Sequence, residues 1–442
     1  MAFTKKIANW GNYPSVEARL DEFENPNQVF DRVHAPGSFI ARGMGLSYGD
    51  ASLSPNILST LRYNRVNNFD QVNGIIQVEA GIMFAEVLKF IVPKGWFVPV
   101  TPGTKFVTIG GAVAGDVHGK NHHREGSFCH YVTRLEVMLA DGSIIYCGPD
   151  ENTELFRNIC GGLGLGGVIL KITFRLKRIE TAYIRQQNRM VRNLDEMLDG
   201  LREFGSTTYS VSWIDCLAKG KSMGRGVLML GEHATPDQVK ETDKLKVHSN
   251  PKFNVPFFFP PGILNSFSIT VFNTLVYNKY NISAKDSIVH YDTFFYPLDF
   301  VRHWNRAYSR RGFLQYQFVI PYETAREGLR EILKMISNSG RAAFLAVLKE
   351  MGEGENVLSF PLPGFTLALD FPVAPGIFPF LDQLDKRVVH YGGRIYLVKD
   401  ARMTAETYWK GYPNAGVFKE QVNRLDPDHK FSSTLSKRLL MK

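Results

Sequence analysis

The sequence has few of the features that mark disulfide-rich, membrane-spanning or nucleic-acid-binding proteins. It contains four cysteines in 442 residues and no CxxC pair, so neither a disulfide framework nor a zinc site is predicted. An apolar run of 18 residues is absent, which argues against a spanning helix. The net charge is +9 without a long Lys/Arg block, so we expect no nucleic-acid partner and assign the charge to another anionic ligand or surface.

The N-terminus and one apolar stretch bear on the location of the protein. Residues 1–15 carry lysines but lack the apolar core of a secretory signal. We therefore expect a cytoplasmic protein with reduced thiols, with peripheral contact at the inner face of the membrane as an option and the periplasm as the alternative. The most apolar stretch, 253–276, is broken by three prolines and a glycine between residues 256 and 262. It predicts a mobile loop, or a surface that meets lipid, and not a continuous transmembrane helix.

The pattern of elements predicts an α+β protein. In the first part of the chain, short strands and helices alternate with glycine-rich loops. Further on, amphipathic helices such as 322–337 alternate with strands. We predict a first domain of residues 1–181, a second of residues 182–393, and a C-terminal segment, 394–442, that returns to the first domain.

A glycine-rich loop covers Arg42 to Asp50. Its glycines at positions 43, 45 and 49 allow backbone N–H groups to approach a phosphate closely. Ser47 adds a hydroxyl donor. A glycine-rich hairpin loop explains the same pattern, so both interpretations stand.

Small residues dominate a second segment, which begins with Pro102-Gly103-Thr104 and continues through residues 110–115. The lack of bulky side chains leaves room for a flat cofactor against the backbone. The alternative is a small-residue helix packed in the core.

Three histidines and a lysine are concentrated in His118-Gly119-Lys120-Asn121-His122-His123. Burying these groups without partners is costly, which favours a functional site. A metal site is one alternative, but neither an HExxH pattern nor a carboxylate-rich partner accompanies the cluster, so we predict no metal. Histidines on the surface are the other alternative.

Residues 162–167 satisfy GxGxxG by their letters. A predicted helix precedes them and a predicted strand follows, whereas the dinucleotide-binding motif needs a strand and then a helix. This order rules out NAD binding there. A glycine loop that contacts a cofactor in another fold stays open.

Taken in this order and spacing, the four segments resemble the vanillyl-alcohol-oxidase-type flavoproteins, which have the PCMH-type FAD fold. The resemblance implies a two-subdomain FAD-binding domain and a substrate (cap) domain with an antiparallel sheet. The motifs are most similar to one branch, the decaprenylphosphoryl-β-D-ribose 2′-oxidases of arabinan biosynthesis in the cell wall. From about Trp10 to Leu440, the resemblance is carried by residues 42–50, 102–104, 116–123, 304–308, 312–318, 363–364, 370–372 and 399–407.

The resemblance implies non-covalent FAD. Relatives with a covalent flavin carry a histidine near position 46, where this chain has Leu46. The residues expected to bind the cofactor are Arg42, Gly43, Met44, Gly45, Leu46, Ser47, Tyr48, Pro102, Gly103, Thr104, Gly110, Gly111, Ala112, Gly115, His118, Gly119, Asn121, His122, Gly164, Gly167, Val168, Ile169 and Tyr396.

The same resemblance places His118 beside the flavin and Lys399 near both flavin and substrate. Because an alcohol has a pKa far above 7, some group must accept or stabilise its proton when a hydride leaves. A lysine can act by its charge or, with a lowered pKa, as a base. We expect Lys399 and His118 to be catalytic, without dividing the work between them. The expected substrate residues are Phe295, Arg306, Gln315, Gln317, Lys349, Thr366, Ala368 and Lys399.

Three of these positions depart from the branch, whose mycobacterial members carry a tyrosine, an asparagine and a cysteine where this chain has Phe295, Thr366 and Ala368. Gln315 and Gln317 share one face of a predicted strand by the period of two, although ordinary strand polarity also explains them. The departures make the flavin site a firmer prediction than the substrate.

The implied reaction is oxidation of the 2′-hydroxyl of a polyprenyl-phosphoryl-β-D-ribose to the 2′-ketone, with a separate NADH-dependent keto-sugar reductase completing the epimerisation to arabinose. For this lipid-linked sugar phosphate, we expect the stretch 253–276 close to the substrate entrance. Arg306 then binds a substrate phosphate or pairs with a surface acid. The alternatives are a flavin oxidase of a soluble sugar, alditol or sugar lactone, and a flavin-free binding protein or basic membrane-associated scaffold.

Overall fold

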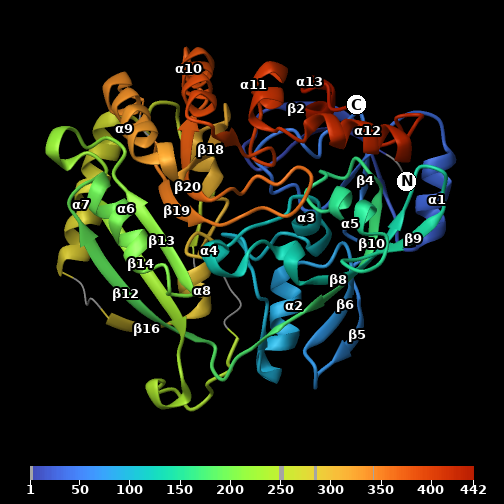
Figure 1. The fold of residues 1–442 in the computed structure, drawn as a ribbon, viewed down its shortest axis with the longest axis horizontal. Helices are drawn as coiled ribbons and strands as arrows, with labels where there is room; N and C mark the ends of the chain where they lie inside the picture. The colour runs from blue at the N-terminus through green and yellow to red at the C-terminus, as the bar shows by residue number, and fades with distance from the viewer. Residues whose placement is uncertain (1–2, 248–252, 283–285, 342) are drawn as a thin grey trace.

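The computed structural model describes residues 3–247, 253–282, 286–341 and 343–442. Two halves lie side by side in Figure 1, one built on sheets of four and five strands and the other on a sheet of eight. Helices pack on mostly antiparallel sheets in both halves, which confirms the predicted α+β class.

The first half is organised around two sheets. Gly74 and Gly142 lie in turns between paired strands, with left-handed φ of 67° and 84°, a conformation that glycine adopts without strain. The four-stranded sheet has the order β1 (Phe3–Ala8), β2 (Ser15–Glu22), β4 (Asn56–Ser59), β3 (Ile40–Arg42), and the antiparallel five-stranded sheet has the order β5 (Val66–Asp70), β6 (Ile75–Glu79), β10 (Val168–Arg175), β8 (Val132–Met138), β9 (Ile144–Cys147).

Short helices connect these strands and carry the loops of the site. The connection from β2 to β3 contains α1 (Pro26–His34), which starts at Asn25, whose side chain accepts a hydrogen bond from the N–H of Gln28. The other elements of this half are α2 (Phe84–Ile91), η1 (Val92–Lys94), β7 (Trp96–Phe97), α3 (Ile109–Ala114), α4 (His122–Glu125), η2 (Phe128–Tyr131), α5 (Thr153–Ile159) and β11 (Lys177–Arg178), which pairs with β7.

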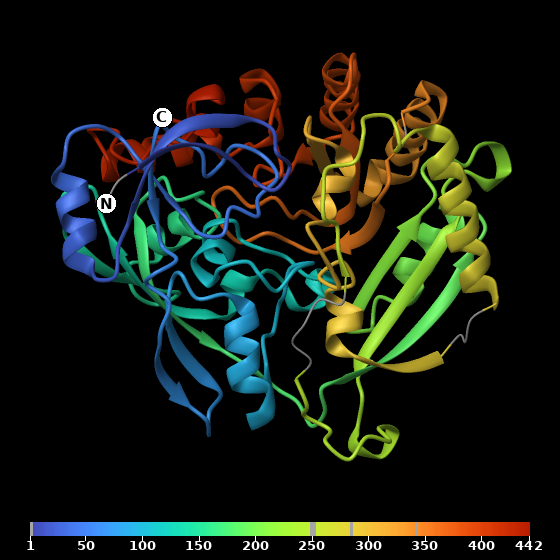
Figure 2. The same cartoon turned by 180° about the vertical axis from the view of Figure 1, so that it is seen from behind.

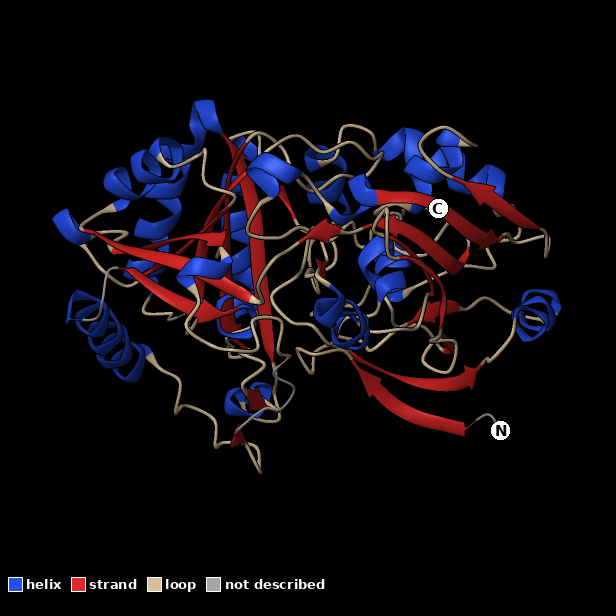
Figure 3. Cartoon of the chain, turned by 90° about the horizontal axis from the view of Figure 1, so that it is seen from below, coloured by secondary structure: helices blue, strands red, loops and turns tan. Residues whose placement is uncertain are grey.

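The second half is built on one antiparallel sheet of eight strands, at the opposite end of the molecule from β1 (Figures 1 and 3). Its order is β16 (Asp286–His290), β12 (Tyr183–Val191), β14 (Gly226–His233), β13 (Tyr209–Ile214), β19 (Ala346–Met351), β20 (Gly364–Pro372), β18 (Phe313–Pro321), β21 (Arg394–Ile395).

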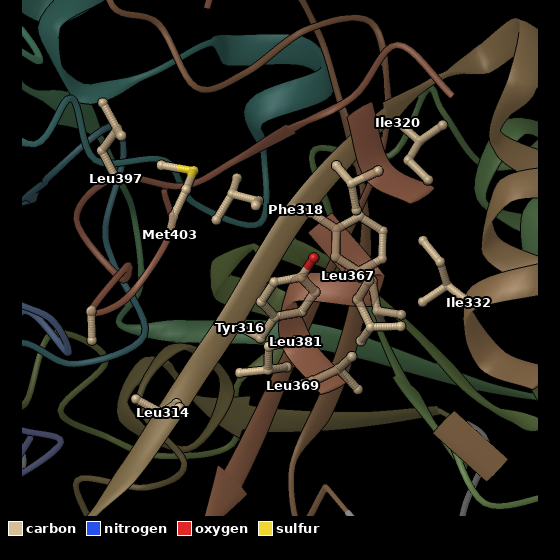
Figure 4. Close-up of a cluster of buried hydrophobic side chains, with 14 of the residues drawn as sticks. Leu314, Tyr316, Phe318, Ile320, Ile332, Leu367, Leu369, Leu381, Leu397 and Met403 are labelled. Carbon is tan, nitrogen blue, oxygen red and sulfur yellow. The ribbon is translucent and has the colours of Figure 1, made fainter. Parts of the chain in front are cut away.

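The two faces of this sheet differ in chemistry. One face packs against the helices α6 (Leu194–Glu203), α9 (Tyr322–Ser339) and α10 (Ile377–His390). Figure 4 shows Leu314, Tyr316 and Phe318 of β18 in the hydrophobic cluster on this face. Because side chains alternate along a strand, Gln315 and Gln317 lie on the opposite face. The predicted sharing of one face by the two glutamines is therefore confirmed.

The apolar stretch 253–276 differs from expectation. Its second part belongs to a helix, α7 (Ser266–Ile282), which lies over β12 and β14 at the outer edge of the molecule (Figure 2). The prolines and the glycine all precede Ser266, so these helix-breaking residues do not interrupt α7. No helix of the described residues is both long enough and apolar enough to cross a membrane. Smaller elements of this half are η3 (Gly220–Ser222), η4 (Pro236–Gln238), β15 (Phe253–Asn254), α8 (Tyr291–Phe295), β17 (Val301–Arg302) and η5 (Trp304–Tyr308).

The C-terminal segment contacts both halves. It contributes β21 to the eight-stranded sheet. It then forms backbone hydrogen bonds with the first half, where Phe39 and Phe431 form a β-bridge and the N–H of Thr434 donates to the carbonyl oxygen of Leu53. Figure 2 shows its helices beside the N-terminal strands. The predicted domain boundaries stay predictions. The helices of the segment are α11 (Ala405–Gly411), α12 (Ala415–Leu425) and α13 (Thr434–Arg438).

Candidate active site

The glycine loop after β3 has a row of unused backbone donors. None of the N–H groups of residues 43–49 donates a hydrogen bond to another described residue. The loop is held from its other side by Asn9, whose Nδ2 donates to Ser47 Oγ at 2.9 Å and to the carbonyl oxygen of Gly49 at 2.7 Å. Arg42 donates to Asn9 Oδ1 at 3.0 Å, and burial lowers the pKa of Arg42 to about 10. Free N–H groups beside a buried cation suit a phosphate or pyrophosphate.

Two glycines of this loop are required by close approach. A Cβ on Gly43 would lie 2.2 Å from Oγ1 of Thr108, the residue that caps α3. A Cβ on Gly49 would lie 1.6 Å from the carbonyl oxygen of Asp400. The loop is thus pressed between the start of α3 and the chain segment that carries Lys399.

The small residues of the second segment serve two purposes. Gly103 and Gly111 are exposed, and a Cβ on Gly103 would meet no atom within 4 Å. Gly110 instead packs on Ala80, to whose carbonyl its N–H donates, and Ala112 is fully buried in the core. Gly110 and Ala112 fit the interpretation as a packed core, while cofactor binding beside the exposed Gly103 and Gly111 stays a prediction. Open space beside bare backbone is what a flat cofactor needs.

His118 lies at the end of a directed chain of hydrogen bonds. The hydroxyl of Thr366 donates to the carbonyl oxygen of Phe318 at 2.8 Å, so its oxygen accepts from Nε2 of Gln317 at 3.1 Å. The same Nε2 donates to Nε2 of His118 at 3.0 Å. That ring nitrogen is therefore unprotonated, and the proton of the neutral imidazole is on Nδ1.

The surroundings keep His118 neutral. Burial first, and then the charge of Lys349, lower the pKa of His118 well below its usual value. Its ring packs against Tyr396 and Phe360, with centroids 5.0 and 5.5 Å away. Tyr396 in turn donates from its hydroxyl to the carbonyl oxygen of Gly115 at 2.8 Å. Nδ1 of His118 is buried without a partner among the described residues, so it is available to a bound molecule.

The neighbours of His118 in the motif have structural partners. Nδ1 of His122 accepts from the N–H of Gly352 at 3.0 Å, and Nε2 of His123 contacts the carbonyl oxygen of Thr207 at 3.0 Å. Asn121 donates to the carbonyl oxygen of Pro99 at 2.8 Å. The three histidines have different partners, and no group of His, Cys, Asp or Glu among the described residues is arranged to hold a metal ion.

Lys399 lies close to Tyr48 and Asp370. Its Nζ is 5.5 Å from the centre of the Tyr48 ring. Burial and the charge of Lys349 lower the pKa of Lys399 to about 7, whereas Asp370 acts to raise it. Burial raises the pKa of Asp370 to about 7, although its carboxylate accepts from Gln315 Nε2 at 2.6 Å. Burial therefore favours the neutral form of Lys399, which is the form that a proton acceptor requires.

Two more lysines complete the polar face of the sheet. Lys349 lies on β19 opposite Thr366 of β20, and burial lowers the pKa of Lys349 to about 8. Burial and the charge of Lys349 lower the pKa of Lys120 to about 7. Neither Lys120 nor Asp370 was among the predicted site residues. The only signal was that both lie inside motifs already noted, HGKNHH and Asp370-Phe371-Pro372.

Other predicted site residues lie elsewhere or use their side chains differently. Arg306 donates to the carbonyl oxygens of Val255 and Pro256 at 2.9 and 3.0 Å, so it is bound to the apolar segment and not to a surface acid. Phe295 is only 2% exposed, in a hydrophobic core to which both halves contribute, and Val168 and Ile169 also point into cores. Met44, Leu46, Pro102 and Thr104 are at least partly exposed in their loops, as are Gly45, Gly164 and Ala368, while Gly119 and Gly167 are buried.

Comparisons with known proteins agree with this geometry. Residues 29–148 match a family model described as an FAD binding domain. The chain is 36% identical to the decaprenylphosphoryl-beta-D-ribose oxidase of Mycolicibacterium smegmatis, over 99% of this chain and 97% of that protein. It is 36% identical to the human Delta(24)-sterol reductase over 22% of this chain and 19% of that protein, and 28% identical to a putative D-arabinono-1,4-lactone oxidase of Neurospora crassa over 32% and 26%. FAD is the cofactor, and the free N–H groups of residues 43–49 fit it.

Proposed function

The chain belongs to the family of decaprenylphosphoryl-beta-D-ribose oxidases, and we propose that it oxidises the 2′-hydroxyl of a polyprenyl-phosphoryl-β-D-ribose to the 2′-ketone. The enzyme is an FAD-dependent oxidoreductase. The likeness along nearly the whole of both chains carries the proposal. A separate NADH-dependent keto-sugar reductase would then complete the epimerisation to arabinose.

We assign the cofactor to the segments with open backbone. The pyrophosphate of FAD fits the free N–H groups of residues 43–49, and the flavin fits the space beside Gly103, Gly111 and His118. Bound FAD supplies the acceptor for a hydride. Leu46 offers no nucleophile for a covalent bond, so FAD should be released into the supernatant when the protein is precipitated with acid. These assignments make residues 1–181 the FAD domain and residues 182–393 the substrate domain.

The two catalytic candidates take different parts. Lys399 accepts the hydroxyl proton, because its lowered pKa of about 7 leaves much of it neutral at physiological pH. His118 stays neutral and presents the N–H of Nδ1 as a donor, because Gln317 occupies its other nitrogen. Gln317 thus acts by orienting His118, while Gln315 orients Asp370 beside the lysine.

The apolar part of the substrate suits an exposed surface of the second half. Three residues of α7 spaced four apart, Phe267, Val271 and Leu275, are 80%, 45% and 64% exposed. Phe253 and Phe257, 60% and 63% exposed, precede them in the chain. We name these five residues the apolar surface, and propose that it meets the membrane in which a polyprenyl chain resides. The protein would then be peripheral at the membrane face where its substrate is made.

The test is anaerobic flavin bleaching by defined substrates. Farnesylphosphoryl-β-D-ribofuranose should bleach the bound flavin of the purified enzyme, while free ribose and D-arabinono-1,4-lactone should not. Lys399→Ala should abolish bleaching with FAD retained. Bleaching at the normal rate would remove Lys399 from its role. Bleaching by the lactone alone would support the second candidate, an oxidase of soluble sugars or lactones, which the likeness to a putative lactone oxidase favours.

A further inference from the structure

Lys120 and Lys349 are two site cations that no acid balances. The ion pairs of lysine among the described residues involve Lys105, Lys171, Lys177, Lys410 and Lys442, and neither of these two. Within the described part of the chain, no side chain accepts a hydrogen bond from either lysine, and Lys120 donates only to the carbonyl oxygen of Phe294. Both residues are partly exposed, although burial lowers the pKa of both ammonium groups. Two ammonium groups without a counter-charge favour an anion between them.

The backbone brings these two lysines to one place. The carbonyl oxygen of Lys120 accepts from the N–H of Ser210 at 2.8 Å, at the start of β13. Ser212, two residues further along that strand, pairs with Leu348, the residue before Lys349. Nζ of Lys120 lies 4.2 Å above the ring of Phe294, which fixes its direction. The charge of Lys349 also acts on His118 and Lys399, so the lysine pair borders the catalytic groups.

We propose that Lys120 and Lys349 form a subsite for the phosphodiester group of the substrate. The subsite lies next to the position of the ribose ring beside Lys399 and His118. This inference rests on the proposed function, because it takes the anion to be the phosphate that joins sugar and lipid. The subsite binds the anion and takes no part in bond making. It selects a glycosyl phosphate over a neutral glycoside.

Charge linkage gives the subsite a dependence on pH. The pKa of Lys120 is about 7 and that of Lys349 about 8 in the structure without an anion. A bound phosphodiester stabilises the charged form of both lysines and raises their pKa values. Binding is therefore stronger below these values and weakens as the pH rises through 7 and 8. A neutral substrate lacks this dependence.

The experiment compares two probes on the holoenzyme, farnesylphosphoryl-β-D-ribofuranose and the neutral farnesyl β-D-ribofuranoside. Lys120→Met and Lys349→Met should each raise the half-saturating concentration of the phosphorylated probe by about 10-fold or more. This is the loss of affinity expected when one hydrogen bond to a charged group is removed. The ratio of the half-saturating concentration of the phosphorylated probe to that of the neutral probe should therefore rise, which separates loss of the phosphate contact from a general loss of sugar binding. The matched control is Lys171→Met, which removes a partly buried lysine paired with Glu136 in the first half. Bound FAD, read from the visible spectrum, shows that each variant is folded.

A second measurement needs no variant. For the wild-type enzyme, the half-saturating concentration of the phosphorylated probe should rise between pH 6.5 and 9, while that of the neutral probe stays constant. Equal pH dependence of the two probes, or unchanged half-saturation in both lysine variants, overturns the subsite and leaves the proposed function standing. Failure of the phosphorylated probe to bleach the wild-type flavin counts against the proposed function itself.

Discussion

Gln317 donates a hydrogen bond from Nε2 to Nε2 of His118 across 3.0 Å. The orientation of this amide is not free, since the hydroxyl of Thr366 already donates to a carbonyl and can only accept from Gln317. One glutamine on β18 therefore sets the tautomer of a histidine that is 199 residues away in the chain. Nδ1 of His118 is left without a partner among the described residues because the strand register places Gln317 at the other ring nitrogen.

Replacing Gln317 with Glu tests this relationship. A carboxylate beside Nε2 would raise the pKa of His118 and draw a proton to that nitrogen. We expect flavin bleaching to slow by roughly 10- to 100-fold, in the range of a lost transition-state donor, with FAD content unchanged. The control is Gln186→Glu on β12 of the same sheet, whose amide donates to Asn188 and to no other side chain of the described ranges. A wild-type rate for Gln317→Glu in stopped-flow bleaching would contradict the assigned role.

The pair of Lys399 and Asp370 predicts a pH profile. A base must be neutral to act, so bleaching should accelerate as the pH rises through the pKa of Lys399, about 7. Asp370 raises that pKa by its charge, so Asp370→Asn should move the inflection to lower pH. Asp385→Asn removes another buried acid, with a pKa of about 6, on α10 beside Arg402, and should leave the inflection in place. An inflection that moves upward in Asp370→Asn would show that Lys399 is not the base.

The glycine positions and the alternation along single strands, both read from short stretches of sequence, predicted the parts of the site where backbone conformation decides what fits. Gly43 and Gly49 were placed in a phosphate loop, and the structure shows why no side chain fits at either position. The alternation of Gln315 and Gln317 was likewise a property of one strand. Such features need only the chain itself.

What the sequence could not show depends on partners far away in the chain. Asp370 meets Lys399, and Lys120 meets Lys349, only through sheet register and loop contacts. His122 was expected to bind the cofactor, yet its ring nitrogens are occupied by Gly352 and Ser127. The helix α7 was not predicted because the prolines were taken to break the whole stretch 253–276. They all precede the first residue of the helix.

Arg438 links the phosphate loop to the lysine segment. Its guanidinium pairs with Asp50 at 2.7 Å and with Asp400 at 2.9 Å, and both carboxylates are buried. Arg438→Met removes the ion pairs of both carboxylates, although Asp400 keeps its bonds from the N–H groups of Arg402 and Met403, and should cost about 3–5 kcal/mol of unfolding free energy. FAD should also be lost more readily, because Asp50 ends the phosphate loop. Urea denaturation and FAD release measure these effects.

The matched control for this variant is Arg424→Met. Arg424 pairs with Glu154 on the surface, where both side chains are more than half exposed, so its loss should change stability little. Equal stability of the two variants would show that the pairs of Arg438 do not hold the two segments together.

The apolar surface predicts binding to lipid vesicles. Phe267 and Leu275 are 80% and 64% exposed on one stripe of α7, and inserting each into a bilayer is worth roughly 1.5–3 kcal/mol. Phe267→Ser with Leu275→Ser should therefore reduce co-sedimentation with vesicles containing phosphatidylglycerol by at least about 10-fold. Bleaching by a short, water-soluble farnesyl substrate should be unaffected. The control, Val72→Ser with Leu440→Ser, removes exposed apolar side chains elsewhere, 88% and 58% exposed. Unchanged vesicle binding in the α7 variant would show that α7 does not meet lipid. A change of oligomeric state alone would show that α7 meets another protein copy.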